Sequence, residues 1–85
     1  MASYELRIKP SAVTELQGVE ARDRARIVGK IQALGEECRP RACEKLTGSD
    51  RYRVRQGVFR IVYQVDDEAS TVTVVKIGHR RDVYR

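Results

Sequence analysis

The sequence contains no apolar run long enough to span a membrane and no charged-then-apolar segment that would direct secretion. We therefore expect a cytoplasmic protein without membrane contact. Repeats, low-complexity stretches and interdomain linkers are also missing. At 85 residues, the chain is expected to form one domain over residues 1–85, with a single modest core.

Cysteine and histidine are scarce. Cys38 and Cys43 are separated by residues 39–42, and His79 is the one histidine. A structural zinc site takes four ligands, and only His79 could join the cysteines, so we expect neither a metal nor a cofactor. The spacing would allow a small disulfide loop, but a chain without a secretion signal is expected to keep both thiols reduced.

Positive charge is plentiful and unevenly placed. The chain has a formal net charge of +5, and residues 45–85 carry nine Lys and Arg against five Asp and Glu. Most of those five acidic residues lie in expected turns, so the strand faces are more basic than the totals indicate. This favours nucleic acid, another polyanion or an acidic protein as a partner, the alternative being a merely solvated face. The turn acids are Asp50, Asp66, Asp67 and Glu68.

The beginning of the chain predicts a strand and a short helix. Apolar and charged residues alternate over positions 4–8, which is the period of a half-buried strand. Ser11 is placed to cap the helix that follows, and Gly18 to end it. The inward side chains of this helix are expected to be Ala12, Val13 and Leu16.

A longer amphipathic helix is expected from Glu20 to about Leu34. Its apolar residues recur at spacings of three and four, opposite a basic face, and Gly35 is the expected C-terminal stop. Residues 36–50 then indicate a polar connection. The inward residues of this helix are expected to be Ala21, Ala25, Val28, Ile31 and Leu34.

The rest of the chain predicts strands near 51–56, 58–66 and 71–77. The fold class is therefore α+β: a strand, two helices and a three-stranded antiparallel meander, with the helices packed on one face of the sheet. Alternate residues of the last two strands should face the helices. They are Phe59, Ile61, Tyr63 and Val65, followed by Val75 and Ile77, and Tyr52 is expected to join this core.

The hairpin near residue 55 carries arginines at alternate positions, which share one face of a strand. A two-residue turn at Gln56-Gly57 would place Arg53 directly opposite Arg60. The same register would place Arg55 opposite Val58. Opposed arginines repel each other, so we expect an anion to bind to this face.

The last strand extends this open face. Lys76 marks its even-numbered positions as the open side, so Arg80 is expected to join the hairpin arginines. By the same alternation Val62, Val72 and Val74 lie on the open side. They would offer a partner, or the C-terminal segment, an apolar surface to cover.

Four short segments stand out in the second half of the chain: Lys-Leu-Thr-Gly at 45–48, Tyr-Arg-Val-Arg at 52–55, Phe-Arg-Ile-Val-Tyr-Gln-Val at 59–65 and Ile-Gly-His-Arg-Arg-Asp-Val-Tyr at 77–84. Together they resemble the RelE branch of the RelE/ParE toxin superfamily. The resemblance, which covers nearly the whole chain, implies a RelE-like microbial RNase architecture. It also implies a toxin of a type II toxin-antitoxin system, an endoribonuclease that cuts mRNA in the ribosomal A site. The implied partners are the ribosome with its mRNA, a RelB-like or similar antitoxin, and operator DNA only through the toxin-antitoxin complex.

In this reaction the 2′-hydroxyl of the substrate attacks the neighbouring phosphorus. The resemblance implies that Arg60 stabilises the phosphate, that Arg80 is an acid or electrostatic stabiliser, and that Tyr84 stacks on or orients the substrate. Arg53 and Arg55 match a catalytic pair that is lysine in the best known members. Further substrate contacts are expected from Arg81, Lys76 and Arg51.

The exchange of two lysines for Arg53 and Arg55 affects the choice of general base, because arginine stays protonated. Either catalysis rests on charge stabilisation, with the ribosome supplying order, or another group takes the proton. His79 is the titratable candidate, although its strand parity points it away from the open face.

Two other functions compete with the nuclease. The ParE branch acts on DNA gyrase and lacks the catalytic set, and a degenerate toxin would be a module that only binds RNA or antitoxin. Fold alone cannot separate these functions. The co-occurrence of Arg60, Arg80 and Tyr84 with two basic residues before the hairpin favours the nuclease.

Overall fold

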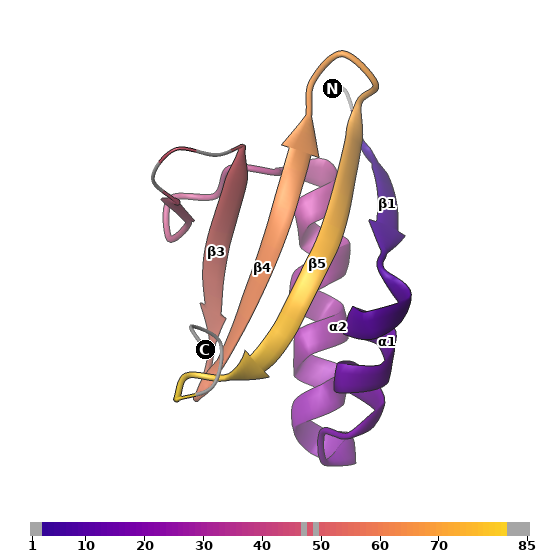
Figure 1. Ribbon diagram of the computed structural model, residues 1–85, viewed down its shortest axis with the longest axis vertical. Helices are drawn as coiled ribbons and strands as arrows, with labels where there is room; N and C mark the ends of the chain where they lie inside the picture. Colours follow the sequence, from indigo (N-terminus) through magenta and orange to yellow (C-terminus); the bar gives the residue numbers. More distant parts are fainter. Residues whose placement is uncertain (1–2, 47, 49, 82–85) are drawn as a thin grey trace.

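The computed structural model describes residues 3–46, 48 and 50–81. They form a five-stranded sheet in the order β1-β5-β4-β3-β2 and two helices (Figure 1). β1 runs parallel to β5, and the other neighbours are antiparallel, which confirms the α+β class. The elements are β1 (Glu5–Ile8), α1 (Pro10–Gln17), α2 (Ala21–Glu36), β2 (Glu44–Lys45), β3 (Arg51–Gln56), β4 (Phe59–Asp66) and β5 (Thr71–His79).

Strand β2 is the element that the sequence did not predict. Glu44 and Lys45 lie inside the stretch expected to be a polar connection, but they pair with Arg53 and Tyr52 of β3. A further backbone hydrogen bond of 2.9 Å, donated by the Leu46 N–H, extends this pairing. Two residues are too few to show a strand period, so the sequence carried no signal for this strand.

Helix α1 begins two residues earlier than predicted. Lys9 occupies the N-cap position without a side-chain cap, and Pro10 supplies the first turn, where its fixed φ suits a helix start and its missing N–H costs nothing. Ser11 is therefore inside the helix and caps nothing, contrary to the prediction. Gly18 follows the helix as expected. Val13 was predicted inward but is 37% exposed.

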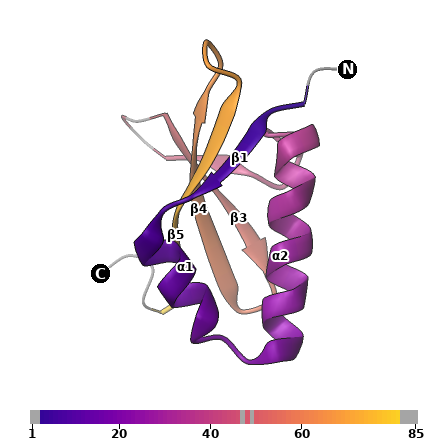
Figure 2. The ribbon, with the colours of Figure 1, turned by 90° about the vertical axis from the view of Figure 1, so that its right-hand side faces the viewer.

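Helix α2 covers one face of the sheet (Figure 2) and continues through Gly35 to Glu36. Gly35 is thus no helix stop. It is buried where the helix meets β1, and a Cβ there would lie 3.1 Å from Cγ of Leu6. The Tyr4 N–H donates a 2.7 Å hydrogen bond to the Gly35 carbonyl. The buried side chains of α2 are Ile27, Ile31 and Leu34, whereas Ala21 and Ala25, predicted inward, are exposed.

Helix α1 packs beside β5 beyond the end of β1. β1 pairs with Thr71–Val74 of β5 only. Past that point, Glu15 of α1 accepts a 3.0 Å hydrogen bond from the Ile77 N–H, which satisfies an edge donor that no strand reaches. Of the described helices, neither is long and apolar enough to cross a membrane.

A β-bulge decides which face the residues of β5 occupy. Val62 pairs with Lys76, but the next residue, Tyr63, pairs with Val74, so Val75 is an extra residue. The alternation of β5 therefore changes sides at Val75, which lies instead in a depression of the open face, beside Thr73. Two valines predicted on the open face, Val72 and Val74, are instead fully buried towards the helices.

The other apolar residues of the meander face the helices as predicted. Tyr63 and Ile61 are fully buried, and Tyr52 stacks on Tyr63 with ring centroids 5.7 Å apart. The open face consequently has few apolar side chains. One of them, Val62, is itself buried, with only 6% of the residue exposed. The core cluster formed with the helices includes Val54, Ile61, Tyr63, Val65, Val72, Val74 and Ile77.

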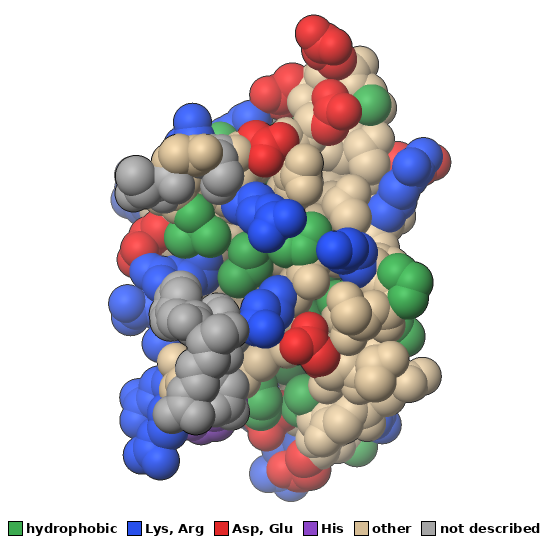
Figure 3. All heavy atoms as spheres, in the orientation of Figure 1, with side chains coloured by type: hydrophobic (Ala, Val, Ile, Leu, Met, Phe, Trp, Pro, Cys, Tyr) green, Lys and Arg blue, Asp and Glu red, His purple; other side chains and the backbone are tan. Residues whose placement is uncertain are grey.

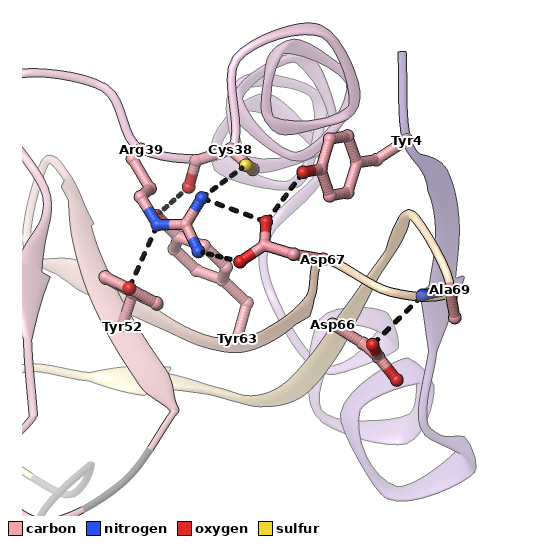
Figure 4. A network of polar contacts seen from close by, with 8 residues as sticks. All are labelled: Tyr4, Cys38, Arg39, Tyr52, Tyr63, Asp66, Asp67 and Ala69. Atoms are coloured by element: carbon pink, nitrogen blue, oxygen red, sulfur yellow. Dashed lines mark hydrogen bonds and ion pairs between the residues drawn. The ribbon is translucent and has the colours of Figure 1, made fainter. Parts of the chain in front are cut away.

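A network of polar contacts holds the connection between α2 and β2 against the sheet (Figure 4). Arg39 makes a two-pronged ion pair with Asp67 of the β4–β5 turn, at 2.7 and 3.2 Å, and donates to the Tyr52 hydroxyl. The Tyr63 hydroxyl donates to the Cys38 carbonyl at 2.7 Å. The hydrogen bonds from Arg39 keep the pKa of Asp67 below its usual value. The network fixes the start of the segment that carries Glu44.

Candidate functional site

The hairpin turn is Gly57-Val58, one residue later than the predicted Gln56-Gly57. Its glycine has φ of 60°, and a glycine with positive φ at the first central position is typical of a type II′ turn. The register therefore places Arg55 opposite Arg60. Arg53 is one position further along the same face and is not opposite Arg60, as had been predicted.

Four arginines gather on the open face of the sheet, with Arg60 at their centre. Partial burial lowers the pKa of Arg60. The positive charges of its neighbours lower it further, in the order Arg55, Arg53 and Arg80. These four residues, here called the arginine cluster, were predicted to come together, and the structure brings them together.

Backbone carbonyls of the turn orient the central guanidinium. Arg60 Nη1 donates to the carbonyl oxygens of Phe59 and Gly57, at 3.0 and 3.3 Å. The Arg80 N–H donates to the Val58 carbonyl at 2.8 Å, which ties the chain after β5 to the same turn. Three members of the cluster come from the consecutive strands β3 and β4, and the fourth comes from the turn after β5.

A carboxylate lies beside the arginine cluster. Glu44 pairs with Arg53 in the β2–β3 register, and its Oε2 forms an ion pair with Arg53 Nη2. The side chain of Arg53 is 18% exposed and that of Glu44 is 53% exposed. The negative charge of Glu44 also acts on Arg60 and offsets a small part of the lowering of its pKa. Sequence reasoning missed this residue, because its position depends on the unpredicted strand β2.

The residues predicted to contact or orient the substrate lie at different places on the molecule. Lys76 lies on the open face opposite Val62, with Nζ 3.9 Å from a carboxylate of α1. Arg51 is exposed at the start of β3, opposite Gln64, and precedes Arg53 by two residues on the same face of the strand. Arg81 is exposed after β5. Tyr84 lies outside the described residues.

His79 lies away from the arginine cluster, as its parity predicted. It pairs with Phe59, and the two rings meet edge to face with centroids 6.1 Å apart. Its Nδ1 accepts a 3.2 Å hydrogen bond from the Arg81 N–H. His79 is therefore oriented by the backbone of the turn that follows it and not by the side chains of the arginine cluster.

Charge is unevenly distributed over the open face, which Figure 3 shows. Lys and Arg side chains spread over the strands, and several acidic side chains gather at the top, where Asp66 ends β4 and Asp67 and Glu68 follow in the β4–β5 turn. Cys38 and Cys43 are both free thiols. Within the described ranges, no three His, Cys, Asp or Glu side chains gather to hold a metal ion.

The chemistry that this face offers is the binding and stabilisation of a phosphate. A guanidinium can engage two phosphate oxygens at once and remains charged when partly buried. Several guanidinium groups around one point can neutralise charge that develops on a phosphorane. None of them readily accepts a proton, so the arginine cluster supplies charge stabilisation but no base.

Comparison with known proteins gives one match to a family model and several to solved structures. Residues 6–84 match the family described as ParE toxin of type II toxin-antitoxin system, parDE. The Mycobacterium tuberculosis toxin RelG is 41% identical over 34 residues, which is 40% of this chain and 39% of that toxin. The match thus spans well under half of the curated relative.

Three solved structures share the fold over most of the chain. The isolated E. coli RelE toxin has a TM-score of 0.82 at 28% identity, covering 96% of this chain and 92% of that chain. In the M. tuberculosis RelBE2 complex the TM-score is 0.82 at 27% identity, with 92% and 99% covered. For the intact E. coli RelBE complex the values are 0.80 and 30%, with 91% and 96% covered.

Proposed function

The chain belongs to the RelE/ParE superfamily of type II toxin-antitoxin toxins, and we propose that it is a ribosome-dependent endoribonuclease that cuts mRNA in the A site and so inhibits translation. The observation that carries this proposal is the arginine cluster, because a plain sheet would not gather like charges without an anion to bind. We further propose that residues 1–85 form one domain.

The proposed reaction is attack of a 2′-hydroxyl on the adjacent phosphate. Arg60, held at the turn, would neutralise the phosphorane, and Arg55 and Arg53 would add charge from β3. Arg80 would face the leaving 5′ oxygen as an electrostatic stabiliser. Tyr84 is proposed to stack on a base of the substrate. The ribosome would hold the nucleotides in line, as the reaction requires.

We propose a RelB-like antitoxin as the protein partner. Two of the similar structures are RelBE complexes, which pair a RelE-type toxin with its antitoxin. An antitoxin for this chain should carry acidic side chains that cover the arginine cluster. Operator DNA would be bound only through the toxin-antitoxin complex, and action on ribosomes would place the protein in the cytoplasm.

The matching family model keeps a second function in competition, because it is named for ParE and not for RelE. ParE-type toxins act on DNA gyrase and do not need the catalytic arginines. The two functions differ in what happens to messages and to supercoiling, and one preparation of toxin can be tested for both.

The test uses purified toxin in a reconstituted translation system, with message ends mapped by primer extension. We expect cuts within the codon in the A site and none in naked mRNA. Gyrase supercoiling, measured with the same preparation, should be unchanged. Intact messages together with inhibited supercoiling would contradict the nuclease and favour the ParE-type function.

A further inference from the structure

The proposed reaction needs a proton acceptor, and the arginine cluster contains none. General acid-base groups must come within hydrogen-bonding reach of the proton that they move. Arg53 and Arg55 occupy the positions of the lysines of the best known relatives, and arginine keeps its proton under ordinary conditions. The acceptor must therefore be another group that faces the same phosphate.

Glu44 is placed at that point by strand β2. The pairing of Glu44 with Arg53 puts its carboxylate at the edge of the arginine cluster, on the open face. Arg53 binds the Oε2 atom of Glu44, and no hydrogen bond from another described residue reaches its Oε1 atom. With 53% of the side chain exposed, a substrate can reach it. A carboxylate that is bonded through one oxygen can still accept a hydrogen bond or a proton on the other oxygen.

We propose that the Glu44 carboxylate accepts the proton of the attacking 2′-hydroxyl, with Arg53 as the positioning residue that holds the carboxylate towards the cluster. This inference rests on the proposed nuclease function. It assigns the base to a residue outside the arginines. The arginines then stabilise charge, and Arg53 also orients the base.

The step balances without any further reactant. The 2′ oxygen gives its proton to Glu44 and forms a bond to phosphorus, while the bond from phosphorus to the 5′ oxygen breaks. The leaving 5′ oxygen takes a proton from water, and the Glu44 carboxyl returns its proton to solvent. The products are a 2′,3′-cyclic phosphate and a 5′-hydroxyl end.

Other titratable groups near the face are engaged elsewhere. His79 contacts Phe59 and is bonded to the Arg81 N–H. The hydroxyl of Tyr63 is buried towards the helices, where burial raises its pKa, and donates to a carbonyl. Glu15 accepts from the β5 backbone, close to Lys76. Asp50, at the far end of the hairpin, accepts from Gln64.

The test compares Glu44→Gln with a matched control, Glu5→Gln. Glu5 is also an exposed glutamate paired with an arginine, Arg7, at 2.7 Å, but it lies on β1 at the opposite edge of the sheet. Single-turnover cleavage is measured with saturating toxin on ribosomes that carry a defined A-site codon. We expect the Glu44→Gln rate to fall by about 10²-fold or more and the Glu5→Gln rate to stay near wild type.

Toxin binding to ribosomes and to antitoxin is measured in parallel, because both must survive in Glu44→Gln if the lost group is a base. Cleavage by Glu44→Gln within threefold of wild type would overturn the inference, and so would a loss explained by weaker ribosome binding. Neither result touches the nuclease proposal, which fails only if the wild type itself does not cut. The two failures are therefore distinguishable.

Discussion

At the scale of single residues, the site is defined by side chains that repel one another. Arg55 faces Arg60 directly, and the charges of Arg53 and Arg80 act on the same guanidinium. Like charges opposite each other destabilise a sheet. An RNA phosphate would relieve this repulsion, and the relief would be greatest at the transition state, where the phosphorane carries more charge than the substrate.

Replacement of Arg60 or Arg80 by alanine should therefore slow cleavage strongly. Each removes a donor aimed at developing charge, and we expect single-turnover rates on ribosomes to fall by about 10²-fold or more. Arg22 on α2 is the control, since it is an exposed arginine on the opposite side of the sheet. Arg22→Ala should cut at the wild-type rate. Undiminished cutting by Arg80→Ala would show that the turn after β5 is not part of the site.

At the scale of elements, the sequence predicted the regular helices and strands but not the irregularities within them. The helices, the strands other than β2 and the inward face of β4 were predictable, because their apolar periods are long enough to see. The bulge at Val75 was not, since a single extra residue reverses the alternation of a strand and leaves no mark in its composition. Val72 and Val74 were assigned to the wrong face for that reason.

The arginine cluster was nevertheless predicted correctly, although the hairpin register was wrong. Moving the turn from Gln56-Gly57 to Gly57-Val58 changes which residues are opposite each other, but Arg53, Arg55 and Arg60 keep their common face. Glu44 could not be predicted, because its place depends on a two-residue strand that is too short to show a strand period. The face of the sheet on which a residue lies was thus easier to infer than the residue it pairs with on the neighbouring strand.

The packing of α2 on β1 gives a test of one such element. Gly29 and Gly35 both lie inside α2, but a Cβ at Gly29 meets nothing within 4 Å, whereas at Gly35 it would press on Leu6. Gly29→Ala should raise the free energy of unfolding by about 0.5–1 kcal/mol, the usual preference of a helix for alanine.

Gly35→Ala gains the same propensity but forces β1 away from the helix, so we expect it to be less stable than Gly29→Ala by about 1 kcal/mol or more. Urea denaturation of the two variants beside the wild type measures the difference. Equal stabilisation by both substitutions would contradict this expectation, because it would mean that Leu6 can move away from the new Cβ without loss of stability.

At the scale of the whole molecule, the two faces of the sheet have separate tasks. One face packs on α2 and supplies the core, so the other is free to carry charge that a core could not accept. The acidic β4–β5 turn lies at one end of that open face and the arginine cluster towards the other. A polyanion would therefore be drawn to the end where β3, β4 and the turn after β5 meet.

The central claim is that this basic face promotes attack by the 2′-hydroxyl of an mRNA held in the ribosomal A site. The most direct test is a message with a single 2′-deoxynucleotide immediately 5′ of the phosphate that is normally cut. Wild-type toxin should bind such ribosomes but leave that position intact, while an all-ribose message yields a 2′,3′-cyclic phosphate and a 5′-hydroxyl end. Cleavage of the deoxy-substituted message at the same position and rate would contradict the account.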